Sequence, residues 1–179
     1  MLTSTAELEN ILTDPNLVLI DTRSFREYSQ GHIPNAVNLD LFSFHWIDTS
    51  KNGIESFNEQ ARKIFSYAGV TEKKNVVFYE TVSGMLAARG VWILQYFSHP
   101  QASMLDGGIT KWSGEGRITT TKPSNFKPAN FSGMPNPKIL AGFQYILDNL
   151  NKITILDVRS KEEFDGILVR AARSGHIPT

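Results

Sequence analysis

Residues 19–24 read Leu-Ile-Asp-Thr-Arg-Ser, and residues 155–160 read Ile-Leu-Asp-Val-Arg-Ser. Each copy contains a short apolar run that ends in a carboxylate, which is typical of a buried strand. In each copy a glutamate, Glu27 or Glu163, follows the serine by three positions. The pattern Ser-x-x-Glu is the capping box that begins a helix. The sequence therefore predicts the same strand-to-helix unit twice.

A second motif follows each copy of the first. Gly-His-Ile-Pro occupies residues 31–34 and again residues 175–178. The two aspartates of the first motif are 136 positions apart, and the two histidines of the second are 144 apart. The second copy therefore has eight extra residues, which we place within 165–174. Because solenoid repeats recur every 20–50 residues or so, a spacing of this length indicates a duplicated domain.

Strands and helices are expected to alternate after the first copy. Apolar runs at 36–39, 76–79 and 102–105 predict three further strands, and apolar residues at helical spacing over 57–67 and 85–97 predict two helices. Strands that alternate with helices form parallel sheets. We therefore expect an α/β fold, a twisted parallel sheet with helices on both faces.

The composition changes between the two copies. Four of the eight prolines fall between positions 114 and 137, among several glycines. This composition predicts an extended linker that is not packed. We accordingly divide the chain into a first domain over 1–115, a linker over 116–136 and the start of a second domain over 137–179.

The start of the second domain is expected to contain a helix and a strand. Asn136-Pro137 is typical of a helix cap followed by proline in the first turn, and the helix should run to about Leu150. The apolar run over 153–157 predicts a strand of the second sheet.

Charge and apolar content narrow the classes of partner. Lysine plus arginine and aspartate plus glutamate both number 18, and no basic run is present, so we expect neither a nucleic-acid nor a membrane partner. The first twelve residues do not have the pattern of a secretion signal. The longest apolar stretch is interrupted by Arg89 and Gln95, so no membrane span is expected and a cytoplasmic location is favoured.

The chain contains no cysteine, which excludes disulfides, cysteine-ligated zinc and a thiol nucleophile within it. Its histidines are too far apart to suggest a local pair of metal ligands. No metal and no cofactor is therefore predicted. The histidines are His32, His45, His99 and His176.

The repeated motifs, Asp-x-Arg-Ser and then Gly-His-Ile-Pro, resemble the two signature segments at the front of rhodanese domains. Residues 79–89 resemble the active-site loop region of that family, and Leu-Asp-Gly-Gly at 105–108 followed by Trp112 resembles its closing motif. The resemblance extends over about 14–112 and again over about 137–179. The chain thus resembles the front part of a tandem-domain rhodanese, a thiosulfate or 3-mercaptopyruvate sulfurtransferase.

This resemblance implies a chemistry that the chain cannot perform alone. Rhodaneses move sulfane sulfur from thiosulfate or 3-mercaptopyruvate to a thiol or cyanide through a cysteine persulfide. In catalytic domains the cysteine directly follows the Val-Val-x-Tyr strand, whereas here Glu80 follows it. In tandem rhodaneses an acidic residue commonly takes this place in a silent first domain. The spacing from His32 to Glu80 places the expected nucleophile beyond Thr179, at about position 224.

The same resemblance implies the partners. They are a small-molecule sulfur donor, a thiol or cyanide acceptor, and either the missing C-terminal half of the protein or another copy of this chain. We expect the 179-residue chain by itself to be inactive.

The motif residues each allow a functional and a structural interpretation. The aspartates could act as general bases, but a carboxylate that ends a strand beside an arginine more often forms a structural ion pair. The histidines could be ligands or acid–base groups, but a hydrogen bond that stabilises a turn is favoured. We assign structural roles to Asp21, Arg23, His32, Asp157, Arg159 and His176.

Three further interpretations concern the surroundings of the two sites. Glu80 could be a catalytic acid, but a carboxylate that accepts the loop N–H groups and fills the anion position is favoured. Arg170 and Arg173, in the eight-residue expansion, could attract an anionic donor or be solvated surface residues. The alternating aromatic residues within 42–46 could form a substrate-facing wall or a loop that packs on the second domain.

Two other functions fit the fold. One is a non-catalytic rhodanese-like module that binds a protein partner. The other is a phosphatase of the same fold, which needs a Cys-x5-Arg loop that residues 80–85 do not provide. The fold by itself cannot distinguish these functions.

Overall fold

The computed structural model of the protein describes residues 1–44 and 46–178, so that His45 and Thr179 lie outside the described residues. The chain divides into two compact units, Met1–Ile139 and Leu140–Thr179. We call them unit 1 and unit 2 and describe each by itself.

Unit 1 is built on a five-stranded sheet in which every pairing is parallel. The strands lie in the order β1-β5-β4-β2-β3. The central pair is in register from Leu17 opposite Asn75 to Asp21 opposite Tyr79. The predicted parallel α/β sheet is thus confirmed. The strands are β1 (Leu2–Thr3), β2 (Leu17–Asp21), β3 (Val37–Asn38), β4 (Asn75–Tyr79) and β5 (Ala102–Leu105).

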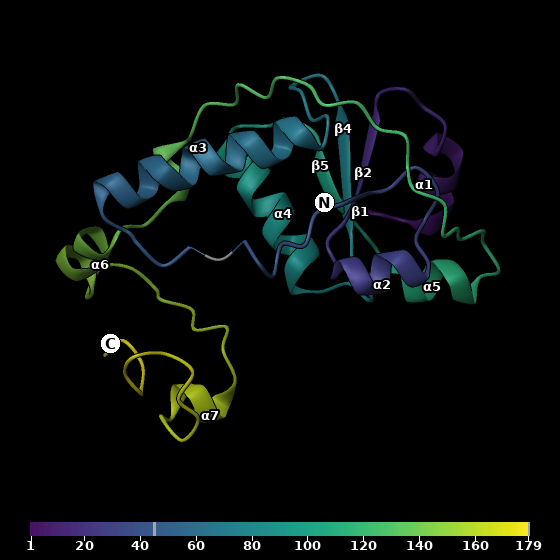
Figure 1. Ribbon diagram of the computed structural model, residues 1–179. Coiled ribbons are helices and arrows are strands. Elements are labelled where there is room, and N and C mark those ends of the chain that lie inside the picture. The colour runs from purple at the N-terminus through teal and green to yellow at the C-terminus, as the bar shows by residue number, and fades with distance from the viewer. Residues whose placement is uncertain (45, 179) are drawn as a thin grey trace. The chain divides into compact units, whose positions relative to one another are not determined.

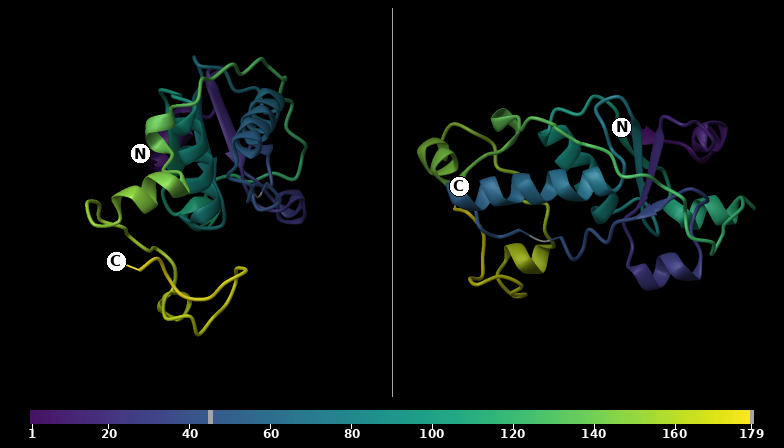
Figure 2. Two further views of the ribbon diagram at one scale, coloured as in Figure 1. Left: turned by 90° about the vertical axis from the view of Figure 1, so that its left-hand side faces the viewer. Right: turned by 45° about the horizontal axis from the view of Figure 1, so that its top comes forward.

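Helices cover both faces of this sheet (Figure 1). Successive strand residues point to opposite faces, so Ile20 packs in the cluster with α3 and α4, and Leu19 packs in the cluster with α1, α2 and α5. Figure 2 shows α3 and α4 side by side on one face. No helix of the described residues is long and apolar enough to cross a membrane. The helices of unit 1 are α1 (Thr5–Ile11), α2 (Phe25–Gln30), α3 (Lys51–Tyr67), α4 (Met85–Tyr96) and α5 (Gly108–Gly114), with a short 3-10 helix at Pro137–Ile139.

Local capping explains where the helices begin. Ser24 and Glu27 form the predicted capping box of α2, which ends at Gly31. Helix α3 begins six residues before the apolar pattern of the sequence, because the hydroxyl of Ser50 accepts the Gly53 N–H at 3.1 Å. Strand β1 and helix α1 were not expected, although Ser4 begins α1 with the same kind of capping box.

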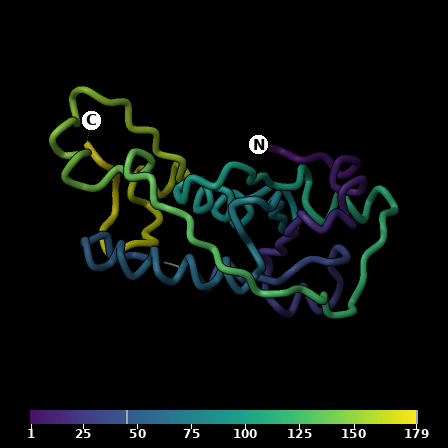
Figure 3. Tube along the Cα trace, turned by 90° about the horizontal axis from the view of Figure 1, so that it is seen from above, coloured from purple at the N-terminus to yellow at the C-terminus, as the bar shows by residue number. Residues whose placement is uncertain are grey.

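Residues 117–136, which we call the strap, run in an extended path along the outside of unit 1 (Figure 3, green). The expectation that this stretch is not packed is wrong, because Phe131 is only 2% exposed and its ring lies 5.7 Å from those of both Phe65 and Phe97. The strap also pairs through Thr120 with His32 in an antiparallel bridge. Whether it also connects two domains stays a prediction.

Unit 2 contains the short helices α6 (Phe143–Asn149) and α7 (Lys161–Phe164). The capping box of the second copy is present at the start of α7. The predicted continuous helix from Pro137 to Leu150 is wrong, because the chain leaves the 3-10 helix after Ile139 and α6 begins only after Gly142.

The predicted strand over 153–157 is also wrong in this structure, which gives these residues no regular secondary structure. In unit 1 the equivalent strand β2 is hydrogen-bonded to β3 and β4. Among the described residues of unit 2 no segment takes either of these places. A strand without a hydrogen-bonded neighbour has little to stabilise it, which accounts for the difference.

Candidate functional site

The loop between β4 and α4 is organised by the side chain of Glu80. Its Oε1 accepts the N–H of Leu86 at 2.8 Å and that of Ala87 at 3.2 Å. These are the second and third residues of α4, whose N–H groups have no partner inside the helix. The residue that precedes the helix, Gly84, has no side chain to cap them. Glu80, four positions before Gly84, therefore caps α4 and places its negative charge at the positive end of the helix.

Two glycines permit this arrangement. A Cβ at Gly84 would lie 2.7 Å from the Oε1 of Glu80. Gly108, at the start of α5, has a φ of +57°, and a Cβ there would lie 2.5 Å from the Glu80 carbonyl oxygen. The loop carbonyls in turn accept N–H groups from the first turn of α5: Ile109 donates to Glu80 at 2.9 Å and Thr110 to Thr81 at 3.0 Å. Both helix N-termini thus hold the loop.

Asp21, at the carboxyl end of β2, forms a buried ion pair with Arg23. The guanidinium donates from Nε to Oδ1 at 3.0 Å and from Nη2 to Oδ2 at 2.6 Å. The same Nη2 donates to the Gly31 carbonyl at 2.8 Å. Asp21 is fully buried and Arg23 is 8% exposed. The ion pair therefore joins the end of β2 to the Gly-His-Ile-Pro motif.

Tyr79 lies between this ion pair and the Glu80 loop, and the sequence did not suggest a role for it. Its hydroxyl accepts the N–H of Ile33 at 3.1 Å. Burial raises the pKa of the Tyr79 phenol well above its usual value, and the charge of Asp21 raises it further. The phenol therefore stays neutral and acts as a structural contact. Its position in the sequence, as the last residue of β4 directly before Glu80, could have indicated that Tyr79 lies near the loop.

His32 is fully buried and uses both ring nitrogens. Nδ1 lies 2.9 Å from the Tyr28 carbonyl oxygen, and Nε2 lies 3.1 Å from that of Lys122 in the strap. Its ring also stacks on that of Tyr28 with centroids 3.7 Å apart. These contacts hold the turn and the strap together and do not present the imidazole to a substrate.

Unit 2 reproduces the ion pair and the Nδ1 and stacking contacts of the histidine. Arg159 donates from Nε and Nη2 to the carboxylate of Asp157 at 2.9 and 2.6 Å, and from Nη2 to the Gly175 carbonyl at 3.0 Å. Hydrogen bonds from Arg159 lower the pKa of Asp157 to about 2. The ring of His176 stacks on Phe164 at 3.8 Å, and its Nδ1 lies 2.9 Å from the Phe164 carbonyl oxygen. The ion pair and the stacked histidine are therefore present in spite of the eight extra residues, but the side chains are more exposed than in unit 1.

The two arginines of the expansion have different surroundings. Both are exposed. Arg173 lines a hollow of about 750 Å³ in unit 2 together with Asp157 and His176, and Arg170 is not among the lining residues. A role of either arginine in the approach of a substrate stays a prediction.

The aromatic loop after β3 is partly packed. The ring of Phe44 lies 5.5 Å from that of Phe57, and Trp46 lies 6.3 Å from the same ring. Phe42 is 70% exposed. Both interpretations of this loop involve a second domain and stay open. Across residues 1–44 and 46–178, no cluster of three or more His, Asp or Glu side chains is arranged to hold a metal ion.

Comparison with known proteins agrees with the motifs. The family model described as "Rhodanese-like domain" matches residues 4–115. A protein named thiosulfate sulfurtransferase from Azotobacter vinelandii is 31% identical over 177 residues, which cover 97% of this chain and 65% of that protein. A sulfur carrier protein, TtuD, from Thermus thermophilus is 26% identical over 193 residues, covering 99% of this chain and 67% of that protein.

A solved structure shares the fold. The crystal structure of SseA from Escherichia coli, described among the 3-mercaptopyruvate sulfotransferases, superposes with a TM-score of 0.80 at 24% identity. The match covers 99% of this chain and 72% of that one. The chain thus spans about two thirds of the length of the curated relatives that it matches. The family match over more than half of the chain, together with the repeated motif geometry, shows that the chain belongs to the rhodanese family.

Proposed function

We propose that the whole protein transfers sulfane sulfur from thiosulfate or 3-mercaptopyruvate to a thiol or cyanide. The transfer would use a cysteine persulfide in the second domain, with unit 1 as a silent scaffold. The observation that carries this proposal is the position of the Glu80 carboxylate at the N-terminus of α4. A rhodanese domain needs its reactive anion at this place, and here a carboxylate with no sulfur chemistry fills it.

With thiosulfate as the donor, the reaction balances without a redox cofactor. A cysteine thiolate would attack the outer sulfur of thiosulfate, the S–S bond would break, and sulfite would leave with the electron pair. Cyanide or a thiolate would then attack the terminal sulfur of the persulfide, which releases thiocyanate or a new persulfide and restores the cysteine thiolate. A chain without cysteine can perform neither step.

Two further findings support a catalytic second domain. Unit 2 keeps the Asp157–Arg159 ion pair and its bond to the Gly175 carbonyl, the contacts that hold the equivalent motif of unit 1. A relative of 31% identity bears the name thiosulfate sulfurtransferase. We infer that unit 2 belongs to a domain of the same fold whose loop carries the nucleophile, and that the protein acts in the cytoplasm.

The test compares two proteins. The 179-residue chain, incubated with thiosulfate and cyanide, should form no thiocyanate above the buffer rate. A protein that also contains the complete second domain should form thiocyanate. Changing the expected cysteine near position 224 to serine should abolish this activity. Turnover by the purified short chain, or by the serine variant of the long one, would overturn the assignment.

The alternative is a non-catalytic rhodanese-like module that binds a protein partner. Apolar side chains exposed around the Glu80 loop, Val82 at 52% and Met85 at 61%, are compatible with it. A longer gene product that has no cysteine in the second domain would favour this alternative over sulfur transfer.

A further inference from the structure

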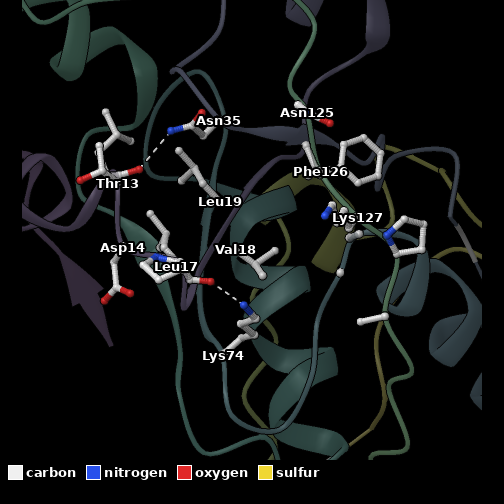
Figure 4. A pocket seen from close by; sticks show the side chains of 17 residues that line it. Thr13, Asp14, Leu17, Val18, Leu19, Asn35, Lys74, Asn125, Phe126 and Lys127 are labelled. Carbon is white, nitrogen blue, oxygen red and sulfur yellow. Dashed lines mark hydrogen bonds between the residues drawn. The ribbon is translucent and has the colours of Figure 1, made fainter.

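A hollow of about 500 Å³ lies in unit 1 at the amino end of β2 (Figure 4). Strands β2 and β4 are parallel, so this end of the sheet is opposite to the end where Glu80 follows β4. The hollow is therefore separate from the Glu80 loop, and binding of a ligand in it does not depend on sulfur transfer. Its volume lies within the range of about 300–1,000 Å³ that small-molecule sites occupy.

The hollow exists because β3 covers only part of β2. Strand β3 pairs with β2 over Ile20 and Asp21, whereas β4 pairs with β2 along all of Leu17–Asp21. The first three residues of β2 therefore have a strand neighbour on the β4 side only, and on the other side they border the hollow.

The outer wall of the hollow is the strap, which is held in place. Gly69 has a φ of +82°, and a Cβ there would lie 2.6 Å from the Lys127 carbonyl oxygen. Two residues further on, the Ala129 N–H donates to the Ser66 carbonyl at 2.8 Å. The wall is therefore defined by close contacts. The interior is mixed, with polar side chains (Thr13, Asn35 and Asn125) beside apolar ones (Leu12, Leu17, Val18, Val37, Ala68 and Phe126).

The charged groups around the hollow favour an anion. Lys74 and Lys127 line it, with Asp14 as their counterpart. One Asp14 oxygen already accepts the Asn16 N–H at 2.8 Å, and Figure 4 shows Asp14 and Lys127 on opposite sides of the hollow. The Lys74 ammonium donates to the Pro15 carbonyl at 2.5 Å, which uses one of its three N–H groups. Two donors of Lys74 and the charge of Lys127 are thus available to a ligand.

We propose that this hollow binds a small carboxylate with an apolar body, such as a short-chain fatty acid or an aromatic acid. The carboxylate lies at the Lys74 ammonium and within the field of Lys127. The apolar body lies against Val18 and Phe126 beside the open edge of β2. A neutral amide of the same shape fits the apolar wall equally well but gains no charge-assisted hydrogen bond.

Isothermal titration calorimetry and ligand-observed NMR on the full chain test this proposal. The probes are hexanoate and benzoate, compared with hexanamide and benzamide. The acids should bind with a dissociation constant on the order of 1 mM, as expected for ligands of this size. The amides should bind about tenfold more weakly, since a hydrogen bond to a charged group contributes roughly that factor.

Three lysine variants locate the site. Lys74→Gln should weaken binding of the acids by about tenfold, and Lys127→Gln by a smaller factor. Lys73→Gln removes the same charge at an exposed neighbour that does not line the hollow, and it should leave the affinity unchanged. Circular dichroism establishes whether each variant is folded. If Lys74→Gln does not fold, Lys127→Gln on the strap serves as the test.

Three results would overturn the proposal. One is the absence of saturable binding by either acid at tens of millimolar. Another is equal affinity of an acid and its amide, which would exclude recognition of the charge. The third is an equal loss in Lys73→Gln and Lys74→Gln, which would indicate diffuse attraction to a basic surface instead of a site.

Discussion

The carboxylate of Glu80 accepts the backbone N–H of Leu86 at 2.8 Å. Through this bond Glu80, which directly follows β4, caps the first turn of α4. The neighbouring bond to the Ala87 N–H, at 3.2 Å, uses the same oxygen. The chain thus satisfies with its own carboxylate two donors that would otherwise attract an external anion.

Removing the charge of Glu80 should destabilise unit 1 modestly. Glu80→Gln keeps an amide oxygen that can accept the same two N–H groups but loses the attraction between a negative charge and the helix terminus. We expect a loss of about 1 kcal/mol in the free energy of unfolding. Urea unfolding followed by tryptophan fluorescence measures it, because Trp46, Trp92 and Trp112 all lie in unit 1.

The control for this change is Glu59→Gln on α3. Glu59 also loses a partner, Lys63 at 2.8 Å, but both side chains are about 70% exposed. Exposed ion pairs of this kind contribute little to stability, because water screens them, so Glu59→Gln should have a clearly smaller effect than Glu80→Gln. Equal effects of the two substitutions would mean that Glu80 is not an effective cap.

The repeated ion pair offers a comparison between a buried and an exposed copy. Asp21→Asn leaves the guanidinium of Arg23 buried without its charge partner, and we expect a loss of about 3–5 kcal/mol in unit 1. Asp157→Asn makes the same chemical change where the side chains of Asp157 and Arg159 are 21% and 39% exposed. It should leave the tryptophan-detected transition of unit 1 unchanged. A small effect of Asp21→Asn would show that water reaches Arg23 in the folded state.

Titration of Asp157 tests the geometry of the second copy. Hydrogen bonds from Arg159 hold its pKa at about 2, below the usual 3.8. Because the pKa in the folded state is depressed, the stabilisation is present above pH 3.8 or so and is lost as the pH falls toward about 2. Carboxyl-carbon NMR should give a midpoint near 2, and Arg159→Gln should move it toward 3.8. A wild-type midpoint near 3.8 would mean that the ion pair does not persist in solution.

Local sequence predicted those parts of the fold that depend on neighbours in the chain. The apolar run that ends at Asp21 and the pair Ser24 and Glu27 contain, within a few residues, the information for β2 and the start of α2. The position of Glu80 directly after β4 also indicated a carboxylate that accepts N–H groups. The N–H groups that Glu80 binds, those of Leu86 and Ala87, belong to the first turn of α4. They are available to Glu80 because Gly84 has no side chain to cap them.

The features that were missed depend on distant partners. Residues 153–157 resemble β2 in sequence, but no strand pairs with them in the described part of unit 2, and strand propensity alone does not order a single segment. Phe131 lies in a stretch whose proline and glycine content predicted a free linker. Its burial requires Phe65 and Phe97, which are 66 and 34 positions away in the sequence.

The strap should therefore contribute to the stability of unit 1, and Phe131→Ala tests this. The ring is 2% exposed and makes edge-on contacts with two buried phenylalanines, so its removal leaves a cavity that the fixed strap cannot fill. We expect a loss of about 3–5 kcal/mol in the free energy of unfolding, the usual cost of removing a buried phenylalanine ring.

The control for the strap is Phe25→Ala, which removes the same ring from the first residue of α2, where it is 70% exposed. This substitution should change the free energy of unfolding by roughly 0.5 kcal/mol or less.

A second measurement removes the strap entirely by comparing chains that end at Glu115 and at Ile139. The family match ends at residue 115, yet the shorter chain should be much less stable, because it loses Phe131 and the strap contacts of His32 and Ser66. Equal stability of the two chains would show that the strap is a linker in solution and that the fold is complete without it.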